Sequence, residues 1–402
     1  ALRLTREARR ERVERYVAVI ASVLLAAAAL AATPAIPPGP PGDAFYTPPS
    51  RLPAAVEGTV IWARTFSGGS ALPSAAANYQ LLYETISPNG TFVGVSGTLA
   101  VPRGAPPARG WPLISWGHGT TGNGPDCAPS RYSHMDGEQR MLDGFVRRGY
   151  AVAQTDYEGN GTPGIHPYMV ATAAARDSTD IVRASRTIDP HIGSDWVVMG
   201  HSEGGGTALS TAALAQQIAP ELNLVGAVAF APYTYPEATL AVELHGREPN
   251  PGLIFLGLLV EGYSTTDPRV VPSQIFEPSF MPHLAELQQK CIYDLMDRSD
   301  WRSVVPASVF RPEGESAVEA LYADLRENDP AYFTIKVPTM IVNGVSDTMV
   351  SSEGSITVAD RLRSYGTPVT FKAYLGATHG TVLSDAAADV AAWVAERFAA
   401  SP

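Results

Sequence analysis

The stretch that most constrains the fold is a short apolar run that ends in Gly200-His201-Ser202-Glu203-Gly204, with a helix-like stretch, Thr207 to Gln217, directly after it. This order is typical of a nucleophile elbow, in which a serine lies on a sharp strand-to-helix turn with its Oγ exposed. Gly200 and Gly204 suit such a turn, because a Cβ at either position would collide with the neighbouring strand and helix. The helix N-terminus would also place partial positive charge beside Ser202, where an oxyanion must be held. The alternative is a chance match in a chain with 36 glycines and 34 prolines, so other features must decide.

Composition and charge exclude several kinds of partner. The chain has 402 residues, of which 45% are hydrophobic and 17% charged, as in an ordinary globular protein. A formal net charge of -11, without a basic cluster after residue 16, argues against nucleic acid. Gly159 to Gly164 matches G-x-G-x-x-G, but Pro163 and Pro167 prevent the helix that a dinucleotide site needs from starting there. No metal-ligand spacing occurs either, so we expect neither a cofactor nor a metal.

The first 33 residues have the pattern of an export signal. Residues 2–15 are rich in arginine, Val17 to Ala32 is apolar apart from one serine, and Ala29-Leu30-Ala31 is a small-residue exit. An uncleaved anchor helix is the alternative, but the apolar run is shorter than the roughly 20 residues that span a bilayer core. We therefore expect residues 1–33 to be a signal peptide and the protein to be secreted.

The two cysteines, Cys127 and Cys291, are consistent with export. In an oxidising compartment an even pair most simply forms one disulfide. Two buried free thiols are the alternative, and they would be favoured if the signal-peptide interpretation were wrong.

The rest of the chain has the pattern of one α/β domain after a linker. Residues 34–57, with the proline-rich segment Pro34 to Pro53, are expected to be a linker without a packed core. Residues 58–402 are expected to be the catalytic domain, in which strands come first and then alternate with helices. Strands are predicted over 59–66, 79–85, 92–101, 112–116, 150–155, 195–199, 224–230, 339–342 and 369–374. Helices are predicted over 141–148, 177–187 and 386–399. This alternation favours a mostly parallel sheet covered by helices on both faces.

The alternation is interrupted once, between Pro232 and Pro338. This interval has helical patches, near 284–296 and 316–326, but no strand rhythm, and Pro251 to Tyr263 is nearly all apolar. We interpret about 233–337 as an inserted helical cap over the carboxyl edge of the sheet, where open α/β sheets bind ligands. The apolar run would then shelter an acyl chain or, alternatively, form the core of the cap.

A nucleophilic serine needs a base, and the base needs an orienting acid. In this kind of fold the order along the chain is serine, then Asp or Glu, then histidine. That order excludes the histidines that precede or adjoin Ser202, namely His118, His134, His166, His191 and His201. His245 and His283 lie in the predicted cap, which leaves His379, in a small loop after the last strand. Asp347 follows the preceding strand. We therefore predict Ser202 as nucleophile, His379 as base and Asp347 as the orienting acid.

The oxyanion that forms during acyl transfer needs two preorganised N–H donors. One should be the amide of Glu203, the residue after the nucleophile. The other should come from the glycine-rich loop that follows the strand ending at Trp116. We assign Thr120 to this role, with Gly119 and Thr121 as alternatives.

From about residue 60 to its end, the chain resembles the secretory lipase family of α/β-hydrolases. The likeness rests on several motifs taken together, Trp116-Gly117-His118-Gly119-Thr120-Thr121-Gly122, Cys127-Ala128-Pro129-Ser130, Asp156-Tyr157-Glu158-Gly159, Gly200-His201-Ser202-Glu203-Gly204 and the Asp347 and His379 loops. The resemblance implies a carboxylic ester hydrolase with a lid-bearing cap, and a disulfide from Cys127 into the cap.

The expected activity is therefore that of a secreted serine esterase or lipase, which acts through an acyl-enzyme on lipid or other acyl esters. Transient contact of the cap with a lipid interface is a further expectation. An acyltransferase that uses the same triad is one alternative, and a catalytically silent binding protein on a hydrolase scaffold is another.

Overall fold

The structure, a computed structural model, describes residues 36–131, 136–311 and 316–401. The signal peptide predicted over residues 1–33 lies outside these ranges. Within them, no helix combines the length and the apolar character needed to cross a membrane. From Pro38 onward the chain forms one compact unit.

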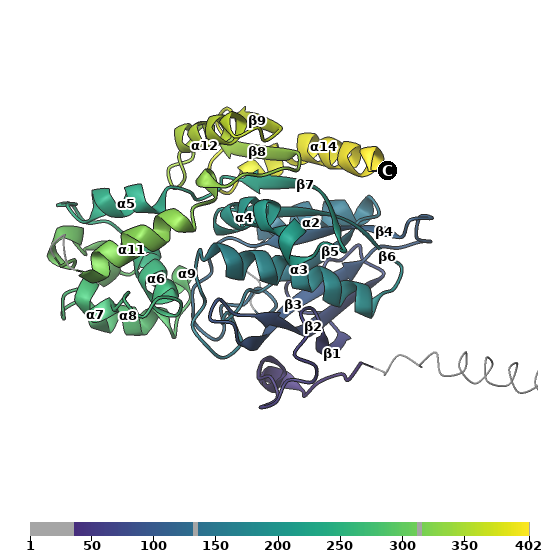
Figure 1. Cartoon of the computed structure of the whole chain (residues 1–402), viewed down its shortest axis with the longest axis horizontal. Coiled ribbons are helices and arrows are strands. Elements are labelled where there is room, and N and C mark those ends of the chain that lie inside the picture. The colour runs from purple at the N-terminus through teal and green to yellow at the C-terminus, as the bar shows by residue number, and fades with distance from the viewer. Residues whose placement is uncertain (1–35, 132–135, 312–315, 402) are drawn as a thin grey trace, which may run out of the picture. The chain divides into compact units, whose positions relative to one another are not determined.

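A nine-stranded sheet in the order β1-β2-β3-β5-β4-β6-β7-β8-β9 is the centre of this unit (Figure 1). The strands are β1 Val60–Thr65, β2 Ala77–Ile86, β3 Phe92–Val101, β4 Trp111–Gly117, β5 Ala151–Thr155, β6 Ile192–His201, β7 Asn223–Phe230, β8 Thr339–Gly344 and β9 Val369–Tyr374. The first three strands pair antiparallel and β3 joins β5 antiparallel, while all pairs from β5 to β9 are parallel. The predicted mostly parallel sheet is confirmed.

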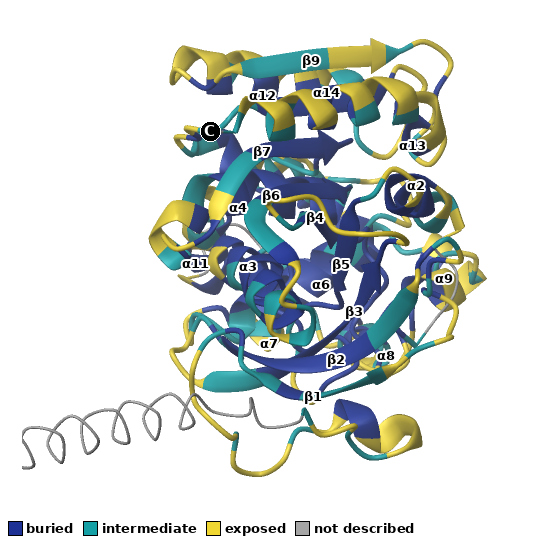
Figure 2. Ribbon diagram, turned by 90° about the vertical axis from the view of Figure 1, so that its right-hand side faces the viewer, coloured by how far each residue is buried: buried dark blue, intermediate teal, exposed yellow. Residues whose placement is uncertain are grey.

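Helices cover both faces of the sheet because its central strands are apolar on both sides. Along β6, Trp196 and Val198 belong to one core, while Val197 and Met199 belong to the core on the opposite face. This alternation follows from the two-residue period of a strand. The helices that pack on the first core are α3 Ala171–Ile188, α4 Glu203–Ile218 and α12 Ser352–Ser364. Those on the second are α2 Asp136–Arg147, α13 Val382–Asp385 and α14 Ala387–Ala400. Figure 2 shows the buried central strands between these layers.

The described part of residues 233–337 is helical and has its own apolar core. Its helices are α5 Pro236–Glu243, α6 Leu253–Ser264, α7 Pro272–Ile275, α8 Met281–Leu287, α9 Ile292–Leu295, α10 Ser299–Arg302 and α11 Ser316–Glu327. They gather at one end of the sheet (Figure 1). There the Ile292 amide donates to the Thr121 carbonyl in the loop after β4, 2.9 Å away. The insertion therefore contacts a loop at the carboxyl edge of the sheet. Its boundaries as a separate domain remain a prediction.

One predicted cap helix is divided. The pattern over 284–296 predicts a continuous helix, but α8 ends at Leu287 and α9 begins at Ile292. Between them Cys291 has extended backbone angles, with φ -79° and ψ 153°. Cys291 is bonded to Cys127 in the loop after β4, and the Ile292 amide bonds to that same loop. These tertiary links replace the helical hydrogen bonds at the break.

The disulfide between Cys127 and Cys291 confirms the predicted pairing, and it joins residues 164 positions apart. Both cysteines are buried. The bond connects the loop that precedes α2 to the cap, so the cap is covalently fixed to the sheet domain at this point.

The prediction that no part of the proline-rich segment packs is wrong for Phe45 and Tyr46. A 3-10 turn, Gly42–Tyr46, places both rings in a small apolar core with Ile61 and Leu82. The Tyr46 hydroxyl accepts a hydrogen bond from Gln80 Nε2 on β2 at 2.6 Å. Two aromatic side chains provide enough apolar area to anchor a segment that is otherwise rich in proline and glycine.

Candidate active site

The turn between β6 and α4 holds Ser202 in a strained conformation. β6 ends at His201, α4 begins at Glu203, and Ser202 between them has φ 58° and ψ -113°. The turn is tight because a Cβ on Gly200 would lie 2.1 Å from the Gly204 carbonyl oxygen. A Cβ on Gly204 would lie 1.9 Å from the oxygen of Gly117. Only glycine fits at these two positions, as their place in the motif indicates. Positive φ at a non-glycine residue is costly and often marks a functional site.

Asp347 and His379 come from neighbouring loops, after β8 and β9, and form a hydrogen-bonded pair. His379 Nδ1 donates to Asp347 Oδ2 over 2.7 Å. Asp347 Oδ1 accepts the backbone amides of Met349 and Val350 at 2.8 and 2.9 Å. With Nδ1 carrying the proton, Nε2 of a neutral His379 is an acceptor.

The electrostatics of Asp347 favour its ionised form. Burial raises the pKa of this carboxyl, but hydrogen bonds from the His379 ring and from the amides of Val350 and Met349 outweigh burial. The net result is a pKa below the usual value for aspartate. At neutral pH the carboxylate therefore carries the negative charge that stabilises an adjacent imidazolium.

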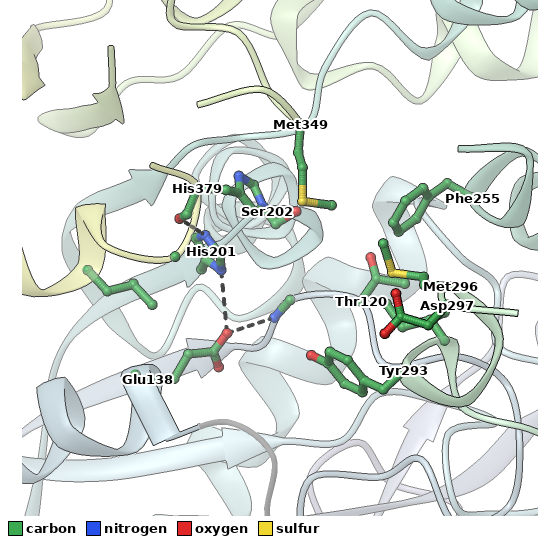
Figure 3. A pocket seen from close by; sticks show the side chains of 15 residues that line it. Thr120, Glu138, His201, Ser202, Phe255, Tyr293, Met296, Asp297, Met349 and His379 are labelled. Carbon is green, nitrogen blue, oxygen red and sulfur yellow. Dashed lines mark hydrogen bonds and ion pairs between the residues drawn. The ribbon is translucent and has the colours of Figure 1, made fainter. Parts of the chain in front are cut away.

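Two cavities meet at Ser202. The first has a volume of about 440 Å³, and its walls include Thr120, His379, Phe255 and Met349 (Figure 3). The second, of about 410 Å³, shares Thr120, Phe255 and Met349. It extends to the cap, where its walls include Tyr233, Thr239, Glu243, Asn250, Pro251, Gly252 and Leu256, while Tyr168 lines it from the loop before α3. A substrate with two arms on either side of its reacting carbon could therefore be held at the serine.

The predicted oxyanion donors flank the serine. Glu203 is the first residue of α4, and His166 Nε2 lies 2.8 Å from its buried carboxylate. In the loop after β4, the Gly119 amide already donates to Glu138 Oε1 over 3.1 Å. Thr120 lines both cavities beside Ser202, and its Oγ1 lies 2.8 Å from the Tyr168 hydroxyl. Of the alternatives left open by the sequence, this arrangement favours Thr120 over Gly119.

The apolar cap run contributes one wall residue and several core residues. Phe255 lines both cavities, whereas Leu259 is fully buried in the cap core. The two interpretations of this run therefore apply to different turns of α6, with Phe255 in its first turn beside the cavities and Leu259 one turn later in the core.

Sequence reasoning missed Glu138 on α2, which lines the first cavity and is almost fully buried. Glu138 precedes the helix predicted over 141–148 and belongs to none of the motifs, so the sequence offers no functional signal for it. His201 lies within the serine motif, but the order of triad residues along the chain gives it no role. Among the described residues, no group of three or more His, Cys, Asp or Glu side chains could hold a metal ion.

Comparison with known proteins identifies the family. Residues 129–402 match the family model described as "Secretory lipase", which is more than half of the chain. The chain belongs to the secretory lipase family. This confirms the resemblance noted from the motifs, and membership makes the chain a carboxylic ester hydrolase.

Relatives and solved structures agree with this assignment. The chain is 25% identical to "Secreted triacylglycerol lipase LIP2" of Malassezia globosa over 385 residues, 90% of this chain and 82% of that one. It is 24% identical to "Probable inactive lipase MT1628" of Mycobacterium tuberculosis, over 90% of this chain and 82% of that one. The crystal structure of Candida antarctica lipase A in its closed state superposes with a TM-score of 0.74 at 20% identity, covering 89% of this chain and 86% of that one. The last similarity shows the fold, an α/β-hydrolase fold.

Proposed function

We propose that this secretory lipase family member hydrolyses acyl esters of lipids through a covalent acyl-enzyme on Ser202. Ser202 Oγ attacks the acyl carbon while His379 Nε2 takes its proton. His379 then gives that proton to the leaving alcohol, and a water molecule, activated in the same way, releases the acid. Asp347 holds the imidazole in the required tautomer.

The observation that carries this proposal is the hydrogen bond from His379 Nδ1 to Asp347 Oδ2, made at the cavity where Ser202 lies. It leaves Nε2 as the basic nitrogen. The aspartate is itself fixed by two backbone amides, so the orientation of the ring is determined by the fold. General-base activation of a serine requires such an oriented imidazole.

Charge that develops on the carbonyl oxygen needs donors that are already in place. The amides of Glu203 and Thr120 are the proposed pair. Glu203 lies at the N-terminus of α4, a helix of 16 residues, whose dipole adds partial positive charge. Loss of one such donor in other serine hydrolases costs about 10²- to 10³-fold in kcat.

Lipid esters are the proposed substrates because apolar side chains line both cavities. Phe255, Met296 and Met349 are common to the two. Each methylene of an acyl chain that leaves water contributes about 0.8 kcal/mol to binding. The name of the Malassezia globosa relative points to triacylglycerols, and the side chain of Met349 is half exposed at the cavity rim, where it could meet a lipid surface.

Secretion is part of the proposal. The family is described as secretory, and the Cys127–Cys291 disulfide suits an oxidising compartment. The N-terminal segment is the proposed export signal.

A series of p-nitrophenyl esters from acetate to palmitate tests the proposed function. We expect turnover across the series, with kcat/KM higher for medium or long chains than for acetate. Added alcohol distinguishes hydrolysis from acyl transfer, since a transferase would form the new ester in preference to free acid. No turnover of any ester would instead favour a silent scaffold, as the name of the Mycobacterium tuberculosis relative suggests for that protein.

A further inference from the structure

We infer that Glu138 and His201 form a positioning pair, which fixes the His379 loop and the Thr120 loop relative to each other around the nucleophile. The inference rests on the proposed function and adds two residues that do not themselves react. Neither residue belongs to the proposed triad, yet both line the cavity at Ser202 (Figure 3).

Glu138 is a buried carboxylate on which three groups converge. Oε2 accepts the indole N–H of Trp116, at the end of β4, over 2.8 Å. Oε1 accepts the Gly119 amide over 3.1 Å, next to the proposed oxyanion donor Thr120. Oε1 also lies 3.5 Å from His201 Nδ1. Glu138 is 3% exposed, so these contacts are made out of water.

His201 continues the connection to the base. Its Nε2 lies 2.9 Å from the backbone carbonyl oxygen of His379. A carbonyl oxygen only accepts hydrogen bonds, so Nε2 must be the donor. The two imidazole rings are also in contact, with centroids 4.5 Å apart. His201 precedes the nucleophile directly, so the same residue joins the serine turn to the loop of the base.

This network links parts of the site that the sheet itself does not hold together. The loop with Thr120 follows β4 and the loop with His379 follows β9, and three strands separate β4 from β9 in the sheet. Acyl transfer needs the base and the oxyanion donors placed together to within about 0.5 Å. A misplacement of about 1 Å can cost about 10²-fold in rate. The path from Gly119 through Glu138 and His201 to the His379 carbonyl joins these two loops, and its middle link, from Glu138 Oε1 to His201 Nδ1, is attractive when Nδ1 carries a proton as well as Nε2.

A glutamine at position 138 would remove the negative charge of the bridge and disturb its hydrogen bonds while keeping its shape. Glutamine has one acceptor oxygen, whereas Trp116 and Gly119 each donate to a different oxygen of Glu138. One N–H donor would then face the NH₂ group of the amide. Glu84→Gln is a matched control, because Glu84 is also buried and accepts a backbone amide, that of Ala54, but is not part of the cavity wall.

The experiment measures kcat and KM for p-nitrophenyl butyrate on the full chain, with active sites counted by phosphonate titration and melting temperatures recorded. We expect Glu138→Gln and His201→Leu each to lower kcat by roughly 10- to 100-fold, with KM within about twofold of wild type. His201→Gln, which can still donate to the His379 carbonyl, should recover part of that loss. The double variant should be no worse than the poorer single variant, since both act through one network. Glu84→Gln should keep the kcat of the wild type.

Several outcomes would overturn the inference. A merely structural role would lower the melting temperature of both variants and leave kcat per titrated site unchanged. Additive losses in the double variant would show two independent effects. Failure of His201→Gln to exceed His201→Leu would remove the link to the His379 carbonyl. A wild-type chain that hydrolyses no ester would overturn the proposed function together with this inference, whereas normal kcat in Glu138→Gln beside an active wild type would overturn the inference alone.

Discussion

At the residue scale, Asp347, the proposed orienting acid, is itself held in place by hydrogen bonds. Asp347 accepts three hydrogen bonds, from His379 and from two amides of its own loop. The order of residues along the chain was enough to select Ser202, Asp347 and His379 for roles in one site. The order of residues does not indicate the tautomer of His379 or the positioning role of Glu138, because both depend on contacts between segments far apart in sequence.

Replacing Asp347 with asparagine tests the role of the carboxylate. An asparagine can present its NH₂ group to His379 Nδ1, which would then favour the tautomer that has its proton on Nε2. We expect kcat to fall by about 10⁴-fold, with the melting temperature close to that of the wild type. Asp360→Asn, at an exposed carboxylate on α12, is the control and should keep full activity. More than a tenth of wild-type kcat in Asp347→Asn would contradict the role.

At the scale of the element, α6 is a helix whose sequence pattern does not show which of its residues line a cavity. The run from Leu253 to Val260 is apolar apart from Gly257, so its period cannot distinguish a face that lines a cavity from one that lines a core. In the structure Phe255 lines the cavities and Leu259 lies in the core of the cap. The apolar run is evident in the sequence, but the surroundings of each side chain depend on what packs around the helix.

Alanine at these two positions should separate binding from stability. Phe255→Ala removes a cavity wall, so kcat/KM for decanoate should fall several-fold relative to acetate while the melting temperature changes little. Leu259→Ala leaves a void in a packed core and should cost about 2–5 kcal/mol of stability, with the ratio of the two esters unchanged. The measurements are kcat/KM for both esters beside thermal unfolding. Equal losses on both esters in Phe255→Ala would remove it from the acyl site.

At the scale of the whole molecule, buried acids make stability depend on pH. Burial raises the pKa of Asp180 and of Asp329 to about 6, and that of Glu261 to about 7. In each case hydrogen bonds to the carboxylate offset only part of this effect. A pKa that is higher in the folded state means that the folded protein binds more protons than the unfolded chain. Stability from these groups is therefore greatest below their unfolded pKa and is lost as pH rises to about 7.

We therefore expect the melting temperature to fall between about pH 4 and pH 7, and the fall to be smaller in Glu261→Gln. Glutamine keeps an acceptor for Gln288, which donates to Glu261 Oε1 over 2.9 Å, but cannot ionise. The control is Glu353→Gln, at the exposed start of α12, which should leave the pH profile unchanged. An identical profile in Glu261→Gln and wild type would contradict this account.

Most of the fold followed from the sequence because periodicity and turn residues act locally. All nine predicted strands occur, and the described part of the interval between Pro232 and Pro338 is helical. The two wrong predictions concern features that depend on tertiary contacts. The buried pair Phe45 and Tyr46 and the break before Ile292 depend on partners distant in sequence, Gln80 for the first and Cys127 for the second. Sequence patterns of one chain do not record such contacts.

The central claim is that Ser202 forms the acyl-enzyme, and covalent labelling tests it most directly. A p-nitrophenyl alkylphosphonate should phosphonylate the serine by forming an Oγ–P bond, with release of p-nitrophenolate. Mass spectrometry of the labelled and digested chain should find one adduct per molecule, on the peptide that contains Ser202. Esterase activity should be lost in proportion, and Ser202→Ala should be neither labelled nor active. An adduct on a different residue, or more than a tenth of wild-type esterase activity in Ser202→Ala, would contradict the account.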